Sequence, residues 1–315
     1  MNDLSGYENV EADDLILPFR LGGGALRGRA VRLGPAVDAI VLRHGYPEPV
    51  AVLLAEALAL AAGLAALLKF EGIFTLQAKG EGPVRTLVAD YRKPGHLRGY
   101  VGFDRDGIAE LQKAIWVKPP LRRLMGPGYL AFTVDQGDQG ESYQGLVKLE
   151  GESLAECAEA YFRQSEQIPT KVRLEAGRVA ASAEGAGTWR AGCLILQRVP
   201  GEGGAVEDDA EDLWPTALGW LDRLQPGDLI DPARSAPLVL SRAFREGVHI
   251  HPPTPLIARC RCSRERAEVI LRSFSAEEIA GMTVEGKITV TCEFCSTTYG
   301  FLPAAFAFVT GSGSA

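Results

Sequence analysis

The sequence is poor in basic charge and in histidine. Its 33 lysines and arginines are outnumbered by 40 aspartates and glutamates, which gives a formal net charge of −7. Clustered lysines and arginines drive the binding of phosphates, so this balance argues against nucleic acid as a partner. The four histidines are scattered at His44, His96, His249 and His251, and no Walker A motif occurs. These absences leave no recognisable catalytic site, and we predict that the protein is not an enzyme.

A secretory signal and a clear membrane span are missing as well. The first fourteen residues are polar and acidic, without the basic and apolar regions of a signal peptide, so we expect a cytoplasmic location. One apolar segment, Val50 to Leu68, is nineteen residues long and carries a single charge at Glu56. It is rich in alanine, which gains little from lipid, and Gly63 interrupts it. We therefore predict a buried core helix here and no membrane partner.

Length and composition suffice for a substantial core. The chain has 315 residues, 46% of them hydrophobic, which predicts one large domain with a smaller module. In residues 1–200 strand and helix patterns do not alternate regularly, so we predict a large N-terminal domain of the α+β class rather than a doubly wound sheet. Strands are predicted at 30–33, 74–78, 86–91 and 130–134, and helices at 48–69 and 152–167.

Residues 201–256 have the composition of a linker. They begin with a glycine-rich stretch and an acidic run, Glu207 to Asp212, and residues 201–246 contain ten acidic side chains against four basic ones. Two apolar stripes at helical spacing nevertheless predict short helices, which must dock on another part of the protein because they cannot bury a stripe alone. The stripes are Leu213, Trp214, Ala217, Leu218, Leu221 and Leu224, and then Leu238, Val239, Leu240, Ala243 and Phe244.

Residues 257–310 are predicted to form a small C-terminal domain. Ser263 can cap one helix, and Ser275 with Glu278 forms a capping box for a second. Residues 287–291 alternate as a strand, and residues 299–301 can return as its partner. The apolar faces expected to be buried are Ala267, Ile270, Leu271 and Phe274 in the first helix, and Ile279 and Met282 in the second. About fifty residues make a marginal core, so a metal should supply much of the folding free energy.

The six cysteines are unevenly placed. Cys157 and Cys193 stand alone in apolar surroundings and are expected to be small buried hydrophobes. The other four fall within 36 positions, which in a reducing compartment favours a metal site over disulfides. Zn²⁺ prefers four soft ligands in a tetrahedron, and two close pairs of thiolates meet that demand. We predict that one zinc ion is bound by Cys260, Cys262, Cys292 and Cys295.

A static zinc ribbon of the kind found in nucleic-acid-binding proteins is the plainer alternative. Residues 259–301 contain six basic and six acidic side chains, which leaves no basic patch for phosphates. Four arginines, at positions 259, 261, 264 and 266, surround the first cysteine pair. Guanidinium groups can stabilise a tetrathiolate and keep it in its reactive anionic form. The sequence therefore predicts a site that is both tight and oxidisable.

The cysteine motif and segments along nearly the whole chain resemble one known family. Cys260-Arg-Cys262-Ser-Arg-Glu-Arg with Cys292-Glu-Phe-Cys295 is similar to the redox-switch motif of the 33 kDa heat-shock protein family, whose members are redox-regulated holdase chaperones. Further segments resemble family segments in the family's order. They are residues 26–33, 68–74, 82–84 with 88–91, 97–100, 143–145 with 149–151, and 161–170.

The resemblance implies a mechanism. Zinc would hold the C-terminal domain folded in the reduced state, while the linker covers an apolar surface for client proteins. Oxidation would form the disulfides Cys260–Cys262 and Cys292–Cys295, release zinc, unfold the C-terminal domain and the linker, and expose that surface. The expected partners are unfolded or partly unfolded proteins, bound without ATP, and a second copy of the chain in the oxidised state.

Two other functions stay open from the sequence alone. The chain could be a constitutive zinc-ribbon interaction module attached to an α+β domain, which would keep its zinc under peroxide. An enzyme with Cys157 or Cys193 as its nucleophile is a third interpretation. Such an enzyme would stay active after loss of all four zinc ligands.

Overall fold

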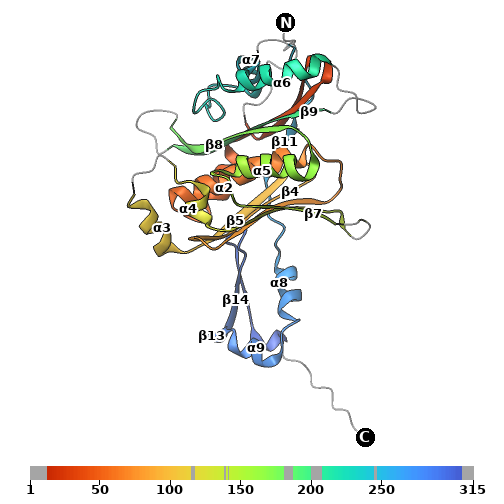
Figure 1. Cartoon of the computed structure of the whole chain (residues 1–315). Helices are drawn as coiled ribbons and strands as arrows, with labels where there is room; N and C mark the ends of the chain where they lie inside the picture. The colour runs from red at the N-terminus through yellow and green to blue at the C-terminus, as the bar shows by residue number, and fades with distance from the viewer. Residues whose placement is uncertain are drawn as a thin grey trace. The chain divides into compact units, whose positions relative to one another are not determined.

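The computed structural model of the chain describes residues 13–114, 118–137, 140, 142–180, 187–199, 208–244 and 247–306, with the backbone alone for residues 208–212. The predicted polar N-terminus up to residue 12, residues 201–207 of the predicted linker and residues 307–310 of the predicted C-terminal domain lie outside this range. The chain forms two compact units, Met1–Arg259 and Cys260–Ala315. The predicted α+β class is confirmed (Figure 1).

The first unit contains two six-stranded sheets, and we call the first of them sheet A. Its strands follow the order β10, β1, β2, β9, β8, with β11 also paired to β1, and every pair is antiparallel. Sequence-distant strands therefore lie side by side, as where β2 pairs with β9. The strands are β1 Leu15–Leu21, β2 Leu26–Leu33, β8 Thr170–Val179, β9 Thr188–Arg198, β10 His249–Ile250 and β11 Thr254–Pro255.

The second sheet, sheet B, has the order β12, β5, β4, β3, β6, β7. Only the short strand β12 pairs in a parallel manner, with β5. The predicted strands at 74–78, 86–91 and 130–134 lie within β3, β4 and β6, and the one at 30–33 lies within β2 of sheet A. The strands are β3 Ile73–Gly80, β4 Val84–Arg92, β5 His96–Phe103, β6 Gly128–Asp135, β7 Tyr143–Lys148 and β12 Ile257–Ala258.

Helix α2, Glu48–Ala65, lies between the two sheets (Figure 1). By length and composition it could cross a membrane, but 83% of the residues in its apolar window are buried inside the fold, so the predicted core helix is confirmed. Gly63 permits the close approach to sheet A, because a Cβ there would lie 2.8 Å from Ile195 Cδ1. The helix ends four residues earlier than predicted, where Arg29 Nε donates a hydrogen bond to the Ala66 carbonyl.

Shorter helices pack around this core, with α1 on β9 and α5 on β8 and β7. The helix predicted at 152–167 begins after Ser153, whose side chain accepts a hydrogen bond from the Glu156 amide, and its last turn is a π-helix, Phe162–Glu166. The others are α1 Pro35–Leu42, α3 Arg105–Gln112 and α4 Leu121–Met125, with α5 at Leu154–Tyr161.

Two helices from the predicted linker cover the outer face of sheet A. They are α6, Asp208–Leu221, and α7, Ala236–Ala243. Their inner side chains share a core with the strands, and Ala217, Leu221 and Leu240 are fully buried in it. Leu238 was wrongly predicted to be buried, because the docking face of α7 is narrower than its apolar stripe. The division into residues 1–200, 201–256 and 257–310 stays a prediction.

Within residues 260–306, the second unit has two α-helices, a three-stranded antiparallel sheet and a final 3-10 helix, Pro303–Phe306. The predicted caps form, because Ser263 accepts a hydrogen bond from the Arg266 amide, and Ser275 and Glu278 make a reciprocal capping box. The elements are α8 Arg264–Leu271, α9 Ala276–Gly281, β13 Thr283–Val284, β14 Lys287–Thr291 and β15 Thr298–Phe301.

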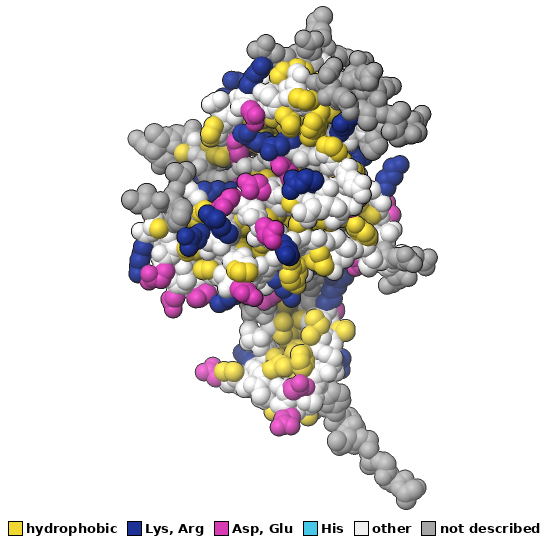
Figure 2. All heavy atoms as spheres, viewed as in Figure 1, with side chains coloured by type: hydrophobic (Ala, Val, Ile, Leu, Met, Phe, Trp, Pro, Cys, Tyr) yellow, Lys and Arg dark blue, Asp and Glu magenta, His cyan; other side chains and the backbone are white. Residues whose placement is uncertain are grey.

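The core of this unit is small. It contains six buried apolar residues: Ala267, Leu271, Ile279, Ile288, Phe301 and Phe306. Ile270 and Met282 were wrongly predicted as core residues. Ile270 is 59% exposed, because one side of α8 packs against the sheet and the other faces solvent. Figure 2 shows hydrophobic side chains at the visible surface of this unit, which fits a core too small to bury them.

Candidate metal centre

The four predicted ligands come from two segments of the second unit. Cys260 and Cys262 lie just before α8, while Cys292 follows β14 and Cys295 lies in the turn that leads to β15. This turn is held by its own backbone, because the amides of Cys295 and Ser296 both donate to the Cys292 carbonyl. Ser296 has a positive φ of 56°, which reverses the chain here. The tight turn points both thiols of the second pair toward the first pair.

The sulfur atoms of these cysteines form one cluster. All four lie within 4.8 Å of one another, with Cys260 3.7 Å from Cys292 and Cys262 3.3 Å from Cys295. A zinc tetrathiolate with bonds near 2.3 Å needs sulfur–sulfur edges of about 3.8 Å, so the cluster fits a tetrahedral ion. Among the residues that the structure describes, it is the one group of three or more cysteine, histidine or acidic side chains close enough to hold a metal.

Two hydroxyl groups lie next to the sulfur atoms. The Tyr299 hydroxyl is 3.2 Å from Cys262 Sγ, and the Thr297 hydroxyl is 3.2 Å from Cys295 Sγ. Cys260 Sγ instead accepts a bond from the Cys262 amide at 3.5 Å. Sequence reasoning missed both hydroxyl residues. Their positions two and four residues after the last cysteine were the available signal, since Thr297 directly precedes the returning strand and Tyr299 lies on it.

The thiols differ in acidity within the cluster. Burial opposes ionisation of Cys295, but hydrogen bonds with the side chain and backbone of Thr297 lower its pKa to about 6. Burial raises the pKa of Cys292 to about 12 and also raises that of Cys262. Cys295 is therefore the thiol of these three that ionises most readily, and thiolates are both the metal ligands and the reactive form of cysteine.

The neighbouring arginines have other contacts. The Arg264 guanidinium lies 4.4 Å from the centre of the Phe301 ring, and Arg266 Nη1 donates to the Arg261 carbonyl at 2.6 Å. Burial is the largest influence on the pKa values of the three thiols, followed by hydrogen bonds with neighbouring cysteines, Tyr299, Thr297 and backbone amides. The two arginine contacts secure α8. The stabilisation of a metal-bound tetrathiolate by the neighbouring arginines stays a prediction.

The two remaining cysteines belong to the first unit. Cys157 and Cys193 are each 1% exposed in the core, and burial raises the pKa of both thiols. Inert buried thiols are what this environment produces. His249 and His251 are exposed side chains of the first unit and do not join the cysteine cluster.

Comparison with known proteins agrees with this geometry. A family model described as Hsp33 protein matches residues 14–302. The 33 kDa chaperonin of Caulobacter vibrioides (strain NA1000 / CB15N) is 46% identical over 305 residues, covering 96% of this chain and 99% of that protein. The 33 kDa chaperonin of Ectopseudomonas mendocina (strain ymp) is 34% identical over 293 residues and 92% of each chain.

A solved structure gives the same result for the fold. The crystal structure of the 33 kDa chaperonin (heat shock protein 33 homolog) from Thermotoga maritima matches with a TM-score of 0.74 and 25% identity, covering 93% of this chain and 96% of that one. The family resemblance predicted from the sequence segments is confirmed, and the chain belongs to the Hsp33 family.

Proposed function

We propose that this protein is a redox-regulated, ATP-independent holdase chaperone activated by oxidative stress. The observation that carries the proposal is the cluster of four thiols within 4.8 Å, in a unit whose described residues, 260–306, include six buried core residues. In the reduced protein the thiolates of Cys260, Cys262, Cys292 and Cys295 would hold one zinc ion. Bound zinc would supply four cross-links, and so much of the folding free energy of this unit.

The switch would be an ordinary sequence of thiol chemistry. A thiolate attacks peroxide, takes one oxygen to become a sulfenic acid and releases hydroxide. A neighbouring thiolate then attacks that sulfur, a disulfide forms and a second hydroxide leaves. We propose the pairs Cys260–Cys262 and Cys292–Cys295, as the family resemblance implies. The shortest sulfur–sulfur distances join the other pairs, so mass spectrometry of peptides from the oxidised protein must decide between the two pairings.

The client surface would be the outer face of sheet A. In the resting protein this face is covered by α6 and α7, whose side chains pack on strand residues such as Leu17, Leu194 and Leu196. The second unit begins at Cys260, directly after β12. Its unfolding would free the chain that ends the linker, and departure of the linker would expose an apolar face to unfolded proteins.

The partners of the protein would follow from the same mechanism. The clients would be unfolded or partly unfolded proteins in the cytoplasm, and the oxidised form would be a homodimer. Nucleic acids and membranes are not proposed as partners. The relatives found are named chaperonins, which fits a binding function without a catalytic site.

A light-scattering assay tests this function directly. A heat-labile client is warmed with the reduced zinc protein in one sample and with the peroxide-treated protein in another, without ATP. We expect suppression of aggregation by the oxidised form alone, together with release of one zinc per chain. Zinc that stays bound under peroxide, with equal activity in both forms, would instead favour a constitutive zinc-ribbon interaction module.

A further inference from the structure

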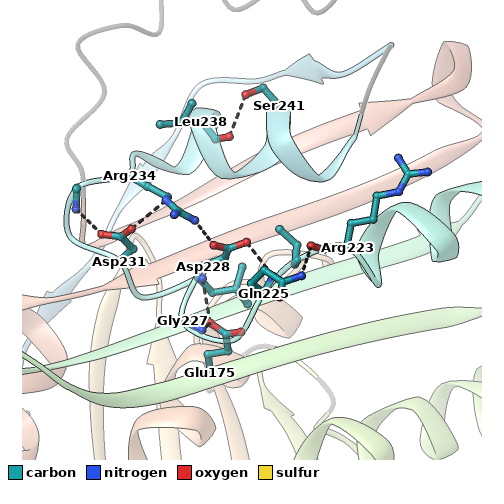
Figure 3. Close-up of polar contacts among 12 residues, drawn as sticks. Glu175, Arg223, Gln225, Gly227, Asp228, Asp231, Arg234, Leu238 and Ser241 are labelled. Atoms are coloured by element: carbon teal, nitrogen blue, oxygen red, sulfur yellow. Dashed lines mark hydrogen bonds and ion pairs between the residues drawn. The ribbon is translucent and has the colours of Figure 1, made fainter.

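The loop between α6 and α7, residues 222–234, is held on sheet A through its main chain. Glu175 on β8 accepts hydrogen bonds from the amides of Gly227 at 3.1 Å and Leu229 at 3.0 Å. Figure 3 shows this carboxylate under the loop. Since the Glu175 carboxylate accepts these two hydrogen bonds from backbone nitrogen atoms, they do not depend on which side chains the loop carries.

Two arginines hold the carbonyl groups of the same loop. Arg32 on β2 donates to the carbonyls of Leu229 at 3.1 Å and Asp231 at 2.7 Å, and Arg190 on β9 donates to that of Ile230 at 2.8 Å. Three successive carbonyls are thus bound by two guanidinium groups. These arginines are 3% and 6% exposed, and Asp13 forms ion pairs with both. Their positions are therefore fixed by the sheet and by Asp13 as well as by the loop.

Glycine makes room for a backbone at this place. A Cβ at Gly192 would lie 2.6 Å from both the Cβ and the carbonyl oxygen of Leu229, closer than atoms can pack. Gly192 pairs with Arg32 on one side and with Glu175 on the other. The two charged side chains therefore flank a glycine on which a main chain can lie directly, a common role of glycine in strands.

A group of polar side chains within the loop contact one another. Arg234 forms ion pairs with Asp228 and Asp231, and Asp228 also accepts a hydrogen bond from the Gln225 amide (Figure 3). These contacts keep the shape of the loop. The loop runs here through turns, in which the amides of Asp228 and Ile230 donate to the carbonyls of Gln225 and Gly227. The contacts from Glu175, Arg32 and Arg190 are of a different kind, because every main chain carries the amide and carbonyl groups that they bind.

We propose that Glu175, Arg32 and Arg190 form a binding site for the main chain of an unfolded client, which can adopt the turns that the loop 222–234 adopts on these residues in the resting protein. This inference rests on the proposed function, in which the linker leaves sheet A. More than nine-tenths of the buried backbone groups of a folded protein are already hydrogen-bonded, whereas an unfolded chain offers them freely. The site would therefore select unfolded over folded protein without selecting a sequence.

The neighbouring apolar face would supply the other half of the recognition. Leu229 of the loop belongs to the same core cluster as Leu194 and Leu196 of β9, so the polar site and the apolar face adjoin. When the loop leaves, the two arginines lose three carbonyl acceptors. A client segment that replaces those acceptors while placing apolar side chains on the sheet restores both kinds of contact.

Variants of the sheet and variants of the loop distinguish an effect on client binding from an effect on release of the linker. Arg190→Met and Arg32→Met change the sheet side, while Arg234→Ala changes only the loop and is the matched control. Both kinds should loosen the resting linker. The measurement is fluorescence anisotropy of a labelled client, kept unfolded by reduction and alkylation, against the fully oxidised proteins. We expect about tenfold weaker binding or more for the sheet-side variants and unchanged binding for Arg234→Ala.

A chemically modified peptide tests the same site in the wild-type protein, so that this test does not require the variants to fold. An apolar peptide is compared with the same sequence N-methylated at alternate residues, which removes donors for Glu175. The oxidised wild type should bind the methylated peptide about tenfold more weakly, and Glu175→Ala should bind both alike. Equal binding of the two peptides by the wild type overturns the main-chain site. If the oxidised wild type binds no unfolded client at all, the proposed function itself fails.

Discussion

The hydroxyl group of Tyr299 is the side-chain feature of the metal centre with the clearest chemical consequence. It lies 3.2 Å from Cys262 Sγ, on the strand that faces β14 across the hairpin. A hydrogen bond to a thiolate withdraws electron density from sulfur and makes it less basic. Since nucleophilicity falls as basicity falls, this contact should slow attack on peroxide by a thiolate that a metal already keeps deprotonated.

We therefore predict that Tyr299→Phe releases zinc faster under peroxide. A hydrogen bond to a charged group contributes about 1.5 to 3 kcal/mol, or roughly a 10- to 100-fold change in basicity. With a dependence of nucleophilicity on basicity of about 0.4 to 0.5, the rate should rise roughly 3- to 10-fold. A chromophoric chelator measures the released zinc. Thr298→Val is the control, since Thr298 hydrogen-bonds Thr291 rather than a sulfur. Equal rates for Tyr299→Phe and wild type would exclude the effect.

The buried carboxyl group of Glu56 should make the stability of the fold depend on pH. Burial in α2 raises its pKa, although the ion pair with Lys118 partly offsets this. A carboxyl group with a raised pKa in the folded state binds its proton more tightly there than in the unfolded chain. The fold therefore loses stability as the pH rises from the ordinary value of 4.5 through the raised one. Glu56→Gln should remove this loss.

The expected gain for Glu56→Gln is about 1 kcal/mol of unfolding free energy at pH 7, because the charge of Lys118 stays partly hydrated after its partner is neutralised. Thermal unfolding of reduced zinc protein between pH 5 and 7 measures it, and the variant should show a smaller fall in Tm over that range. Glu110→Gln, in an exposed ion pair with Lys113, is the control. A lower Tm for Glu56→Gln at pH 7 would mean that the ion pair outweighs the burial of charge.

Among the elements, α7 decides how firmly the linker covers sheet A. Leu240 is fully buried against the strands, whereas Leu238, two residues away on the same helix, is 43% exposed. A leucine-to-alanine substitution can therefore be made at one buried and one exposed position of the same helix. Leu240→Ala should cost about 2 to 5 kcal/mol in docking of the linker, while Leu238→Ala should cost much less.

We accordingly predict that the oxidised Leu240→Ala variant becomes an active chaperone at a lower temperature than the oxidised wild type. Oxidised Leu240→Ala should suppress client aggregation at a lower temperature than the oxidised wild type, and oxidised Leu238→Ala should match the wild type. The assay is light scattering of one client over a temperature series. An equal shift for both variants would show that helix propensity, rather than docking on the sheet, governs release.

Elements with local sequence patterns were predictable, and contacts between distant segments were not. Ser263, the capping box of Ser275 and Glu278, and the strand before Cys292 are local patterns, and each forms as predicted. Ile270 and Leu238 were misplaced because an apolar stripe does not reveal how wide a docking face is. The contacts of Arg32 with a loop about 200 residues away have no local pattern at all.

At the scale of the whole molecule, the two units should differ greatly in their dependence on zinc. The first has a continuous core around α2, built from both sheets. The described part of the second has six buried apolar residues and the cysteine cluster. Since zinc binding contributes on the order of 10 kcal/mol to a small module, loss of the metal should unfold the second unit while the first keeps its fold.

We predict that the second unit and the linker respond to oxidation in two separate stages. Oxidation at low temperature should release zinc and unfold the second unit, yet leave chaperone activity incomplete, and mild heating or denaturant should then complete it. The reason is that α6 and α7 remain docked on sheet A through their buried side chains and the main-chain contacts of residues 227–231, none of which involves a cysteine. Opposing this docking are the entropy of ordering the linker backbone and the self-repulsion of the acidic run before Leu213.

Circular dichroism, zinc release and light scattering, followed on the same oxidised sample, separate the two stages. Zinc release and partial loss of secondary structure should be complete in the cold. A further cooperative loss of helix signal should appear on warming and coincide with full suppression of client aggregation. Full activity from peroxide alone in the cold, with no later transition, would mean that the linker depends on the second unit for its docking and that the contacts with sheet A are too weak to hold it.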